Sequence, residues 1–275
     1  MATLGVFVRQ VSPGNEFAIA LGRFGIGFAC LAGLRALQPD GGGESPGVSW
    51  AHAAAGVSLA LFVFSYFKAV HSGTLANAAF LLYLGPLIAS SLAALWLEER
   101  FDRVSGLLLG CAVLGTLFIT EFKLPDGSQQ AESLVFGLLS GLFYGLFLLF
   151  NNSRLQGGGS SSANTSHQLG IAALVMIPFV AVDGVNLDAA DAVWIAAIGI
   201  LHGFLALTLV IASLKYLKTI EYGTISYGEP VIAALIGALA YHERISGLQL
   251  VGCFLVFAAG MARILLVAGS PRRAA

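Results

Sequence analysis

Glu229 is the residue in this sequence whose position most strongly suggests chemistry. It is the only Asp, Glu, Lys or Arg between Tyr222 and Tyr241, in an otherwise largely apolar stretch. A carboxylate in the hydrocarbon interior of a membrane is costly, so such residues usually serve a function. Glu229 could bind an ammonium or other cationic group, or carry a proton. In the alternative interpretation, it is hydrogen-bonded within a helix bundle and bends the chain near Pro230.

Two tyrosine–proline pairs stand in corresponding apolar stretches. Tyr83 and Tyr227 lie three residues before Pro86 and Pro230, about one helical turn away. A proline removes one backbone hydrogen bond from a helix, which predicts a kink at each proline, either a hinge or a static bend. The two tyrosines either flank a bound substrate or belong to the core. Asn77, on the same predicted helix as Tyr83, is a weaker binding candidate.

Arg23 and His202 are two further ionisable residues within apolar stretches. Arg23 could attract an anionic group of a substrate, but its place near the start of its stretch favours a side chain extended to the membrane surface. His202 could relay protons or bind substrate, or be a neutral histidine hydrogen-bonded to a neighbouring helix. The sequence has no His-Glu spacing typical of metalloenzymes and no phosphate-binding loop, so we expect neither a metal nor another cofactor.

The composition indicates which elements must position these residues. The chain of 275 residues is 57% hydrophobic and 11% charged, whereas soluble proteins carry about 25% charged residues. So few charges cannot cover a surface exposed to water, which predicts an all-α integral membrane protein surrounded by a lipid bilayer. The net charge of −1 gives no electrostatic reason to expect a nucleic-acid partner.

Nine stretches fit the length of a membrane-spanning helix, which needs about 20 mainly apolar residues. A shorter apolar segment, Ala2–Val8, resembles the end of a further membrane helix. Lys and Arg gather in the loops on one side of these spans, which predicts a cytoplasmic C-terminus and a cell-membrane location. The predicted spans are Phe17–Leu37, Trp50–Phe67, Ser72–Leu97, Val104–Thr120, Ser133–Ser153, Gln168–Val182, Ala192–Leu214, Tyr222–Tyr241 and Ile245–Ala262.

An internal repeat relates the two halves of the chain. It divides the sequence into residues 1–123 and 132–268, called here the N-terminal and C-terminal halves. Each half holds five predicted helices if Ala2–Val8 is counted, and an odd number of spans inverts the second half in the membrane. Inverted repeats are typical of secondary transporters, with the substrate near the midplane between the halves. The recurring residues, at identical spacing, are Tyr83, Pro86, Glu99 and Arg100, then Tyr227, Pro230, Glu243 and Arg244.

Glycines at four-residue spacing form one face of the span Ser133–Ser153. Gly137, Gly141 and Gly145 stack on this face. Small residues at this spacing let membrane helices approach closely, so we expect packing within the bundle. A homodimer through such a face is the alternative.

The two stretches Phe67–Ile119 and Ala212–Ala262 both resemble the EamA-type repeat of the drug/metabolite transporter superfamily. The resemblance rests on Pro86, on the acidic helix end at Glu98 and Glu99, on Glu229-Pro230-Val231 and on Glu243. It implies a ten-helix bundle of two inverted five-helix repeats that moves small metabolites by alternating access. The sequence departs from that pattern at its start, where only Ala2–Val8 corresponds to helix 1.

Together these observations predict a secondary transporter, an exporter of small organic metabolites such as amino acids or drug-like solutes. Two alternatives stay open: a non-transporting membrane scaffold, and a membrane enzyme that uses His202 and Glu229. The predicted substrate-binding residues are Glu229, Tyr83, Tyr227, Asn77, His202 and Arg23, and the predicted hinges are Pro86 and Pro230.

Overall fold

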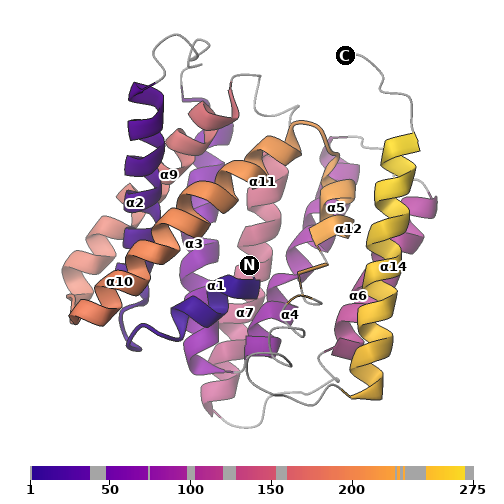
Figure 1. Cartoon of the computed structure of the whole chain (residues 1–275), viewed down its shortest axis with the longest axis horizontal. Coiled ribbons are helices and arrows are strands. Elements are labelled where there is room, and N and C mark those ends of the chain that lie inside the picture. The colour runs from indigo at the N-terminus through magenta and orange to yellow at the C-terminus, as the bar shows by residue number, and fades with distance from the viewer. Residues whose placement is uncertain are drawn as a thin grey trace.

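The computed structural model describes residues 2–37, 48–73, 75–97, 103–119, 128–152, 160–226, 228–229, 232 and 246–269. Within these residues the chain forms helices and no strand (Figure 1). The elements are α1 (Ala2–Val8), α2 (Glu16–Ala36), α3 (Trp50–Ser72), α4 (Leu75–Leu82), α5 (Leu84–Trp96), α6 (Arg103–Ile119), α7 (Ser128–Phe150), α9 (Ser161–Asp183), α10 (Ala189–Ile198), η1 (Gly199–Leu205), α11 (Ala206–Leu214), α12 (Thr219–Ser226) and α14 (Gly247–Gly269).

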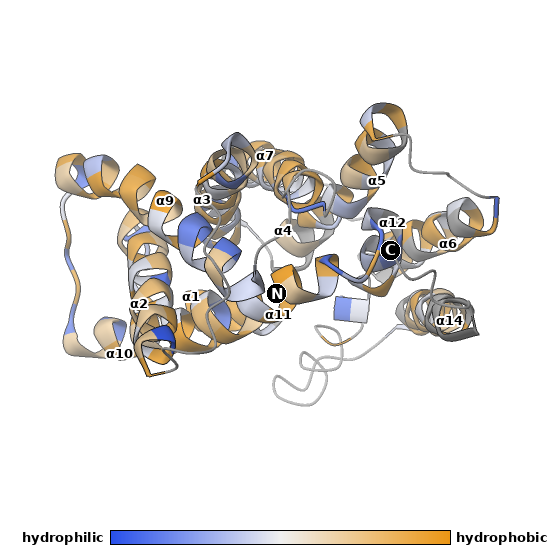
Figure 2. Cartoon of the chain, turned by 90° about the horizontal axis from the view of Figure 1, so that it is seen from above, coloured by the Kyte–Doolittle hydropathy of each residue, from blue (hydrophilic) through white to orange (hydrophobic). Residues whose placement is uncertain are grey.

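Among the described residues, five helical stretches are long and apolar enough to cross a membrane. They are α2, α3, α9, most of α7 (Ala131–Phe150), and the continuous stretch Ala189–Leu214 that joins α10, η1 and α11. Hydrophobic residues occur along all of these helices (Figure 2). Large hydrophobic side chains such as Leu174, Val193 and Leu209 are exposed, as lipid contact requires. The helices α5, α6 and α14 are also apolar. The predicted spans are therefore helical over most of their described lengths.

Contacts between helix ends show that α3 and α7 run in opposite directions. At one end of the bundle, the rings of Trp50 and Phe150 pack with centroids 5.9 Å apart, so α3 begins where α7 ends. At the other end, the Lys68 ammonium lies 3.8 Å from a Glu132 carboxylate oxygen, so α3 ends where α7 begins. We call these the Trp50 end and the Glu16 end, because α2 begins at Glu16 beside the last turn of α3.

The predicted span Ser72–Leu97 is broken in the middle. α4 ends at Leu82, Tyr83 forms a turn, and α5 begins at Leu84. The cause is Pro86, which has no N–H to offer the Leu82 carbonyl and whose ring would collide with it. Pro86 instead occupies the first turn of α5, where a backbone N–H has no partner in the helix. The predicted kink at Pro86 is confirmed, and Pro230 lies outside the described residues.

Glycines form two close helix crossings. A Cβ atom added at Gly141 would collide with the Leu81 carbonyl oxygen, and one at Gly145 would lie 2.8 Å from the Gly85 carbonyl oxygen. The glycine face of α7 is therefore packed against α4 and α5, as predicted. In the second crossing, Gly203 of η1 packs against the backbone of Arg23 in α2.

The segment η1, Gly199–Leu205, is a π-helix in the middle of a predicted span. The Ala206 N–H bonds to the carbonyl of Leu201, five residues earlier rather than four. A π-helical turn widens the helix and shifts the face that its side chains present. Single turns of this kind are frequent at functional sites, and His202 lies within this one.

The helix predicted as Gln168–Val182 begins earlier than expected, at Ser161. The Ser160 hydroxyl caps it by accepting a hydrogen bond from the Ala163 N–H. The early residues are polar, which made them resemble a loop. They are nevertheless largely buried within the bundle, and Asn164 Oδ1, for example, accepts a hydrogen bond at 3.0 Å from Nε2 of His52 in α3.

Candidate functional site

A small cavity lies in the interior of the bundle and has a volume of about 70 Å³. The N-terminal half contributes Arg23 of α2 and Phe62 of α3, and the C-terminal half contributes Tyr144, His202, Tyr222 and Glu229, among others. This volume has room for a few ordered water molecules and is well below the roughly 300 Å³ at which ligand pockets usually begin. The described conformation therefore holds only a small space among these residues.

Glu229 is held by Tyr83. The Tyr83 hydroxyl donates a hydrogen bond to Oε2 of Glu229 at 2.9 Å. Tyr83 is only 2% exposed, and the break between α4 and α5 places it at the end of the shorter helix. The structure thus joins Tyr83 and Glu229, two of the residues predicted to bind substrate, by a hydrogen bond. The contact joins the N-terminal half to the C-terminal half.

Arg23 is buried rather than extended to the membrane surface. Arg23 is only 1% exposed. Its Nη2 donates a hydrogen bond to the carbonyl oxygen of His202 at 3.2 Å. The expectation that Arg23 reaches the surface is therefore wrong. The physical reason is the glycine crossing: because Gly203 has no side chain, η1 lies directly against α2 and covers Arg23.

His202 faces the cavity and the first helix of the chain. Its Nε2 lies 2.9 Å from the Thr3 hydroxyl oxygen, a hydrogen-bond distance. Its ring meets the Phe7 ring edge-on, with centroids 5.4 Å apart. Its Nδ1 is buried and has no partner among the described residues. The structure thus brings His202, Arg23 and Glu229 to one cavity.

Aromatic residues form a wall of the cavity. The Phe62 and Tyr144 rings have centroids 4.9 Å apart, and the hydroxyls of Tyr144 and Tyr222 are 3.3 Å apart. Sequence reasoning did not select Phe62, Tyr144 or Tyr222. Aromatic residues in apolar helices usually belong to the core, and no local pattern in the sequence shows that these three meet.

Three predicted site residues cannot be placed at the cavity. Asn77 lies in α4, but its side chain is outside the described part of the structure. Tyr227 and the predicted hinge Pro230 also lie outside the described residues.

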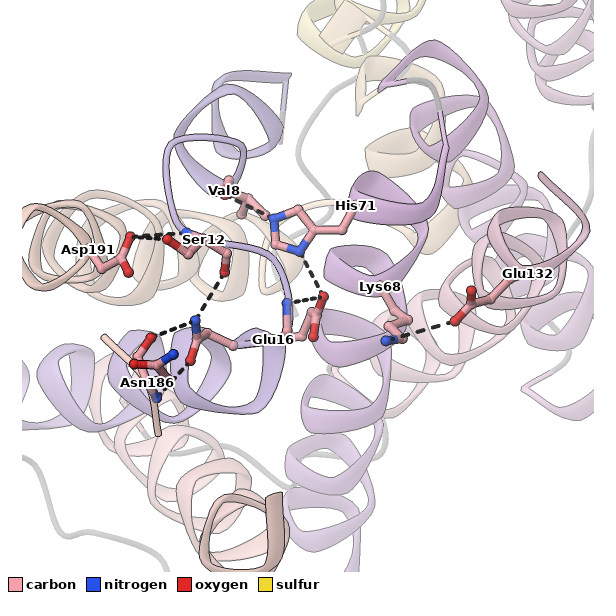
Figure 3. Close-up of polar contacts among 10 residues, drawn as sticks. Val8, Ser12, Glu16, Lys68, His71, Glu132, Asn186 and Asp191 are labelled. Atoms are coloured by element: carbon pink, nitrogen blue, oxygen red, sulfur yellow. Dashed lines mark hydrogen bonds and ion pairs between the residues drawn. The ribbon is translucent and has the colours of Figure 1, made fainter. Parts of the chain in front are cut away.

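Polar contacts hold the Glu16 end of the bundle together (Figure 3). The His71 imidazole Nδ1 and a Glu16 carboxylate oxygen are 2.8 Å apart, and both side chains are largely buried. Nearby, the Ser12 N–H donates to the Asp191 carboxylate at 3.0 Å, and the Asn15 amide donates to the Asn186 carbonyl at 3.1 Å. These contacts join α2 to α3 and the segment before α2 to the segment around the start of α10.

A larger hollow of about 710 Å³ lies at this same end, between the segments 12–15 and 183–191. Its polar groups already bond to one another: Asp191 accepts from Ser12, and Asp188 accepts from the Asp191 N–H at 2.7 Å. It lies beyond the helix ends rather than within the bundle. The small cavity inside the bundle, which brings together Arg23, His202 and Glu229, is therefore the better candidate for the site.

At the Trp50 end, side-chain amides form hydrogen bonds between helices. The Gln168 amide donates to Asn151 at 2.7 Å, and the Asn151 amide donates back to Gln168 at 3.2 Å. The Asn152 amide donates to the Thr219 hydroxyl at 3.0 Å. These bonds join α7 to the starts of α9 and α12. Polar contacts between helices are thus found at both ends of the bundle.

Comparison with known proteins gives a consistent result. Residues 1–121 and 132–262 each match the model of the EamA-like transporter family. An uncharacterized transporter of Archaeoglobus fulgidus is 27% identical over 94% of this chain and 90% of its own length. The threonine/homoserine exporter RhtA of Escherichia coli (strain K12) is 26% identical over 77% of this chain and 70% of its own length. One solved crystal structure superposes on 99% of this chain and on 94% of its own length, with a TM-score of 0.79 and 18% sequence identity. It therefore has the same fold as this chain.

Proposed function

The chain belongs to the EamA-like transporter family, and from that premise we propose that it exports small amino acids or related metabolites by alternating access. It is an integral membrane protein, as its apolar helices and its transporter relatives indicate. The family and these relatives point to a transporter rather than an enzyme. The substrate class, the direction and the mechanism are our proposals.

One observation carries the proposal: the cavity between the halves contains the carboxylate of Glu229 among aromatic and aliphatic side chains. An ammonium group is the ligand that best matches a carboxylate in such a place, because the two charges compensate each other where water is scarce. Aromatic faces favour a cation as well. The name of the RhtA relative, a threonine/homoserine exporter, adds support for an amino-acid substrate.

The mechanism that we propose uses the polar contacts between helices at the two ends of the bundle. In alternating access, one half of the bundle rocks against the other around a fixed site. The contacts at the Glu16 end and at the Trp50 end would break in turn, and the site would open to one side at a time. We further propose that the halves are inverted repeats and that the break at Tyr83 and Pro86 is a point of bending.

The test is export from whole cells. The wild-type chain and a Glu229→Gln variant are expressed at matched membrane levels, cells are loaded with L-threonine or L-homoserine, and both solutes are measured inside and outside by mass spectrometry. We expect faster export with the wild type than with an empty vector, and loss of that difference in the variant. Glu132→Gln makes the same change at a partly exposed side chain and is the matched control, which should still export faster than the empty vector.

Other outcomes would contradict the proposal in different ways. A chemically altered product that depends on Glu229 and His202 would favour the membrane-enzyme alternative. Equal export by wild type and empty vector for all amino acids, with well-folded protein in the membrane, would favour a scaffold. Export that is unchanged in Glu229→Gln would keep the transporter and remove Glu229 from its site.

A further inference from the structure

We propose that Arg23 binds the carboxylate of the substrate while Glu229 binds its ammonium group, so that one zwitterion joins the two halves of the bundle. This inference rests on the proposed function and adds a specificity-determining residue to it. It predicts that the protein distinguishes a free amino acid from the corresponding amide or amine, which lacks the carboxylate.

The first observation is that Arg23 is buried without enough partners. Its Nη2 bonds to the His202 carbonyl, but Nε and Nη1 are buried and have no hydrogen-bond partner among the described residues. A guanidinium stays charged in proteins, and a buried charge without compensation is strongly unfavourable. The side chain lines the cavity, so an acceptor placed there would supply what the described protein groups do not.

The chemistry of the missing partner follows from the charge. A neutral carbonyl already occupies one nitrogen, but it contributes no negative charge. A carboxylate provides both charge and acceptor atoms, and arginine–carboxylate hydrogen bonds are among the strongest in proteins. A carboxylate is therefore the group that best completes the surroundings of Arg23.

The second observation is that the opposite charge lines the same cavity from the other half. Arg23 belongs to α2 of the N-terminal half, and Glu229 belongs to the segment that follows α12 in the C-terminal half. An amino acid carries a carboxylate and an ammonium group on one carbon. Its carboxylate can bond to Arg23 while its ammonium group bonds to Glu229, whereas an amine brings no acceptor to Arg23 and a simple carboxylate brings a second negative charge to Glu229.

The same arrangement argues against multiply charged anions. A phosphate ester would bring two negative charges to one arginine and would be repelled by the Glu229 carboxylate. The balance of one cation and one anion around the cavity suits a solute with zero net charge. Closure of the two halves around such a solute would leave no uncompensated charge at this site.

The experiment measures binding separately from transport. The purified full chain in detergent is titrated with each of the twenty amino acids and with the amides of those that bind, and thermal stabilisation is recorded. We expect the amide to require a roughly 10- to 100-fold higher concentration than the free amino acid, the range of a hydrogen bond to a charged group. Arg23→Gln should reduce this ratio to about one, and Arg23→Lys should retain part of it because the charge remains.

The control is Arg9→Gln. Arg9 also donates a hydrogen bond from Nη2 to a backbone carbonyl, that of Gly73, at 3.1 Å, but it is exposed and does not line the cavity. This variant should keep the wild-type ratio. If Arg23→Gln does not fold, the wild-type ratio and Arg23→Lys still decide the question.

Two results would overturn the inference: a wild-type protein stabilised by no amino acid, or a preference for the free acid that survives in Arg23→Gln. The same proteins in liposomes separate this inference from the proposed function. Selective binding without transport would leave Arg23 as the carboxylate site and remove the transporter proposal. Transport of the acid and the amide at equal rates would keep the transporter proposal and remove Arg23 as the carboxylate site.

Discussion

The Tyr83 hydroxyl and the Glu229 carboxylate are joined by a hydrogen bond of 2.9 Å. Tyr83 comes from the break between α4 and α5, and Glu229 comes from the other half of the chain. The contact therefore ties the halves together beside the central cavity. Any movement of one half against the other must stretch or break it.

Tyr83→Phe should weaken transport without unfolding the protein. The change removes the hydroxyl that donates to Glu229 but keeps the ring, so packing is preserved. A hydrogen bond to a charged group is worth about 1.5–3 kcal/mol, and we expect the half-saturating substrate concentration to change accordingly in liposome assays. Tyr216→Phe removes a hydroxyl from an exposed tyrosine and should have no effect. Identical kinetics in both variants would show that the bond is dispensable.

Gly203→Ala should disrupt the crossing of η1 and α2. The new methyl group would collide with the Arg23 carbonyl oxygen, and overpacking of a tight interface typically costs about 1–3 kcal/mol. Thermal unfolding in detergent should show a lower melting temperature. Gly25→Ala is the control on α2, because nothing lies within 4 Å of its added Cβ. Equal melting temperatures would contradict the close crossing.

Glu16→Gln should destabilise the Glu16 end. The carboxylate is largely buried with His71 at 2.8 Å, and weakening one buried hydrogen bond of this kind should cost about 1–3 kcal/mol. Glu132→Gln breaks a partly exposed pair at 3.8 Å, for which about 0–1 kcal/mol is expected. Scanning calorimetry should therefore show a larger loss of unfolding free energy in Glu16→Gln than in Glu132→Gln. A larger loss in Glu132→Gln would contradict our interpretation of this end.

Pro86→Ala should slow transport more than it affects stability. Alanine restores an N–H group and removes the ring that keeps α5 from continuing into α4, so the two helices are free to join. We expect a several-fold lower maximal rate with a nearly unchanged melting temperature. Pro178→Ala, within α9, makes the same change in another helix. A rate equal to wild type in Pro86→Ala would make the break a static feature.

Much of the fold follows from the sequence, because bilayer thickness fixes the length of an apolar span. The Tyr–Pro spacing also predicted a kink at Pro86, and the structure has a helix break three residues earlier, at Tyr83. Arg23 was placed wrongly, because its distance from a helix end says nothing of the neighbour that covers it. That neighbour depends on Gly203, more than 150 residues away in the chain.

Two other features could not be predicted for related reasons. The π-helical turn around His202 alters the backbone hydrogen bonding over a single short segment. The apolar residues on either side of it fit an ordinary α-helix as well. The cavity tyrosines Tyr144 and Tyr222 are on different helices, so their contact is a property of packing. Asn164 lies before the predicted start of its helix at Gln168, because polar residues resemble a loop when their hydrogen-bond partners on other segments are unknown.

The polar start of α9 has a consequence for how the protein is made. Asn164 and Gln168 form their hydrogen bonds with His52 of α3 and Asn151 of α7, and both of those helices are synthesised before α9. A newly made α9 entering lipid alone would carry these amides without partners, whereas one that meets α3 and α7 already in the bilayer would not. Membrane insertion of this helix should thus depend on the helices that precede it, and a chain lacking His52 and Asn151 should release α9 from the membrane during synthesis more often.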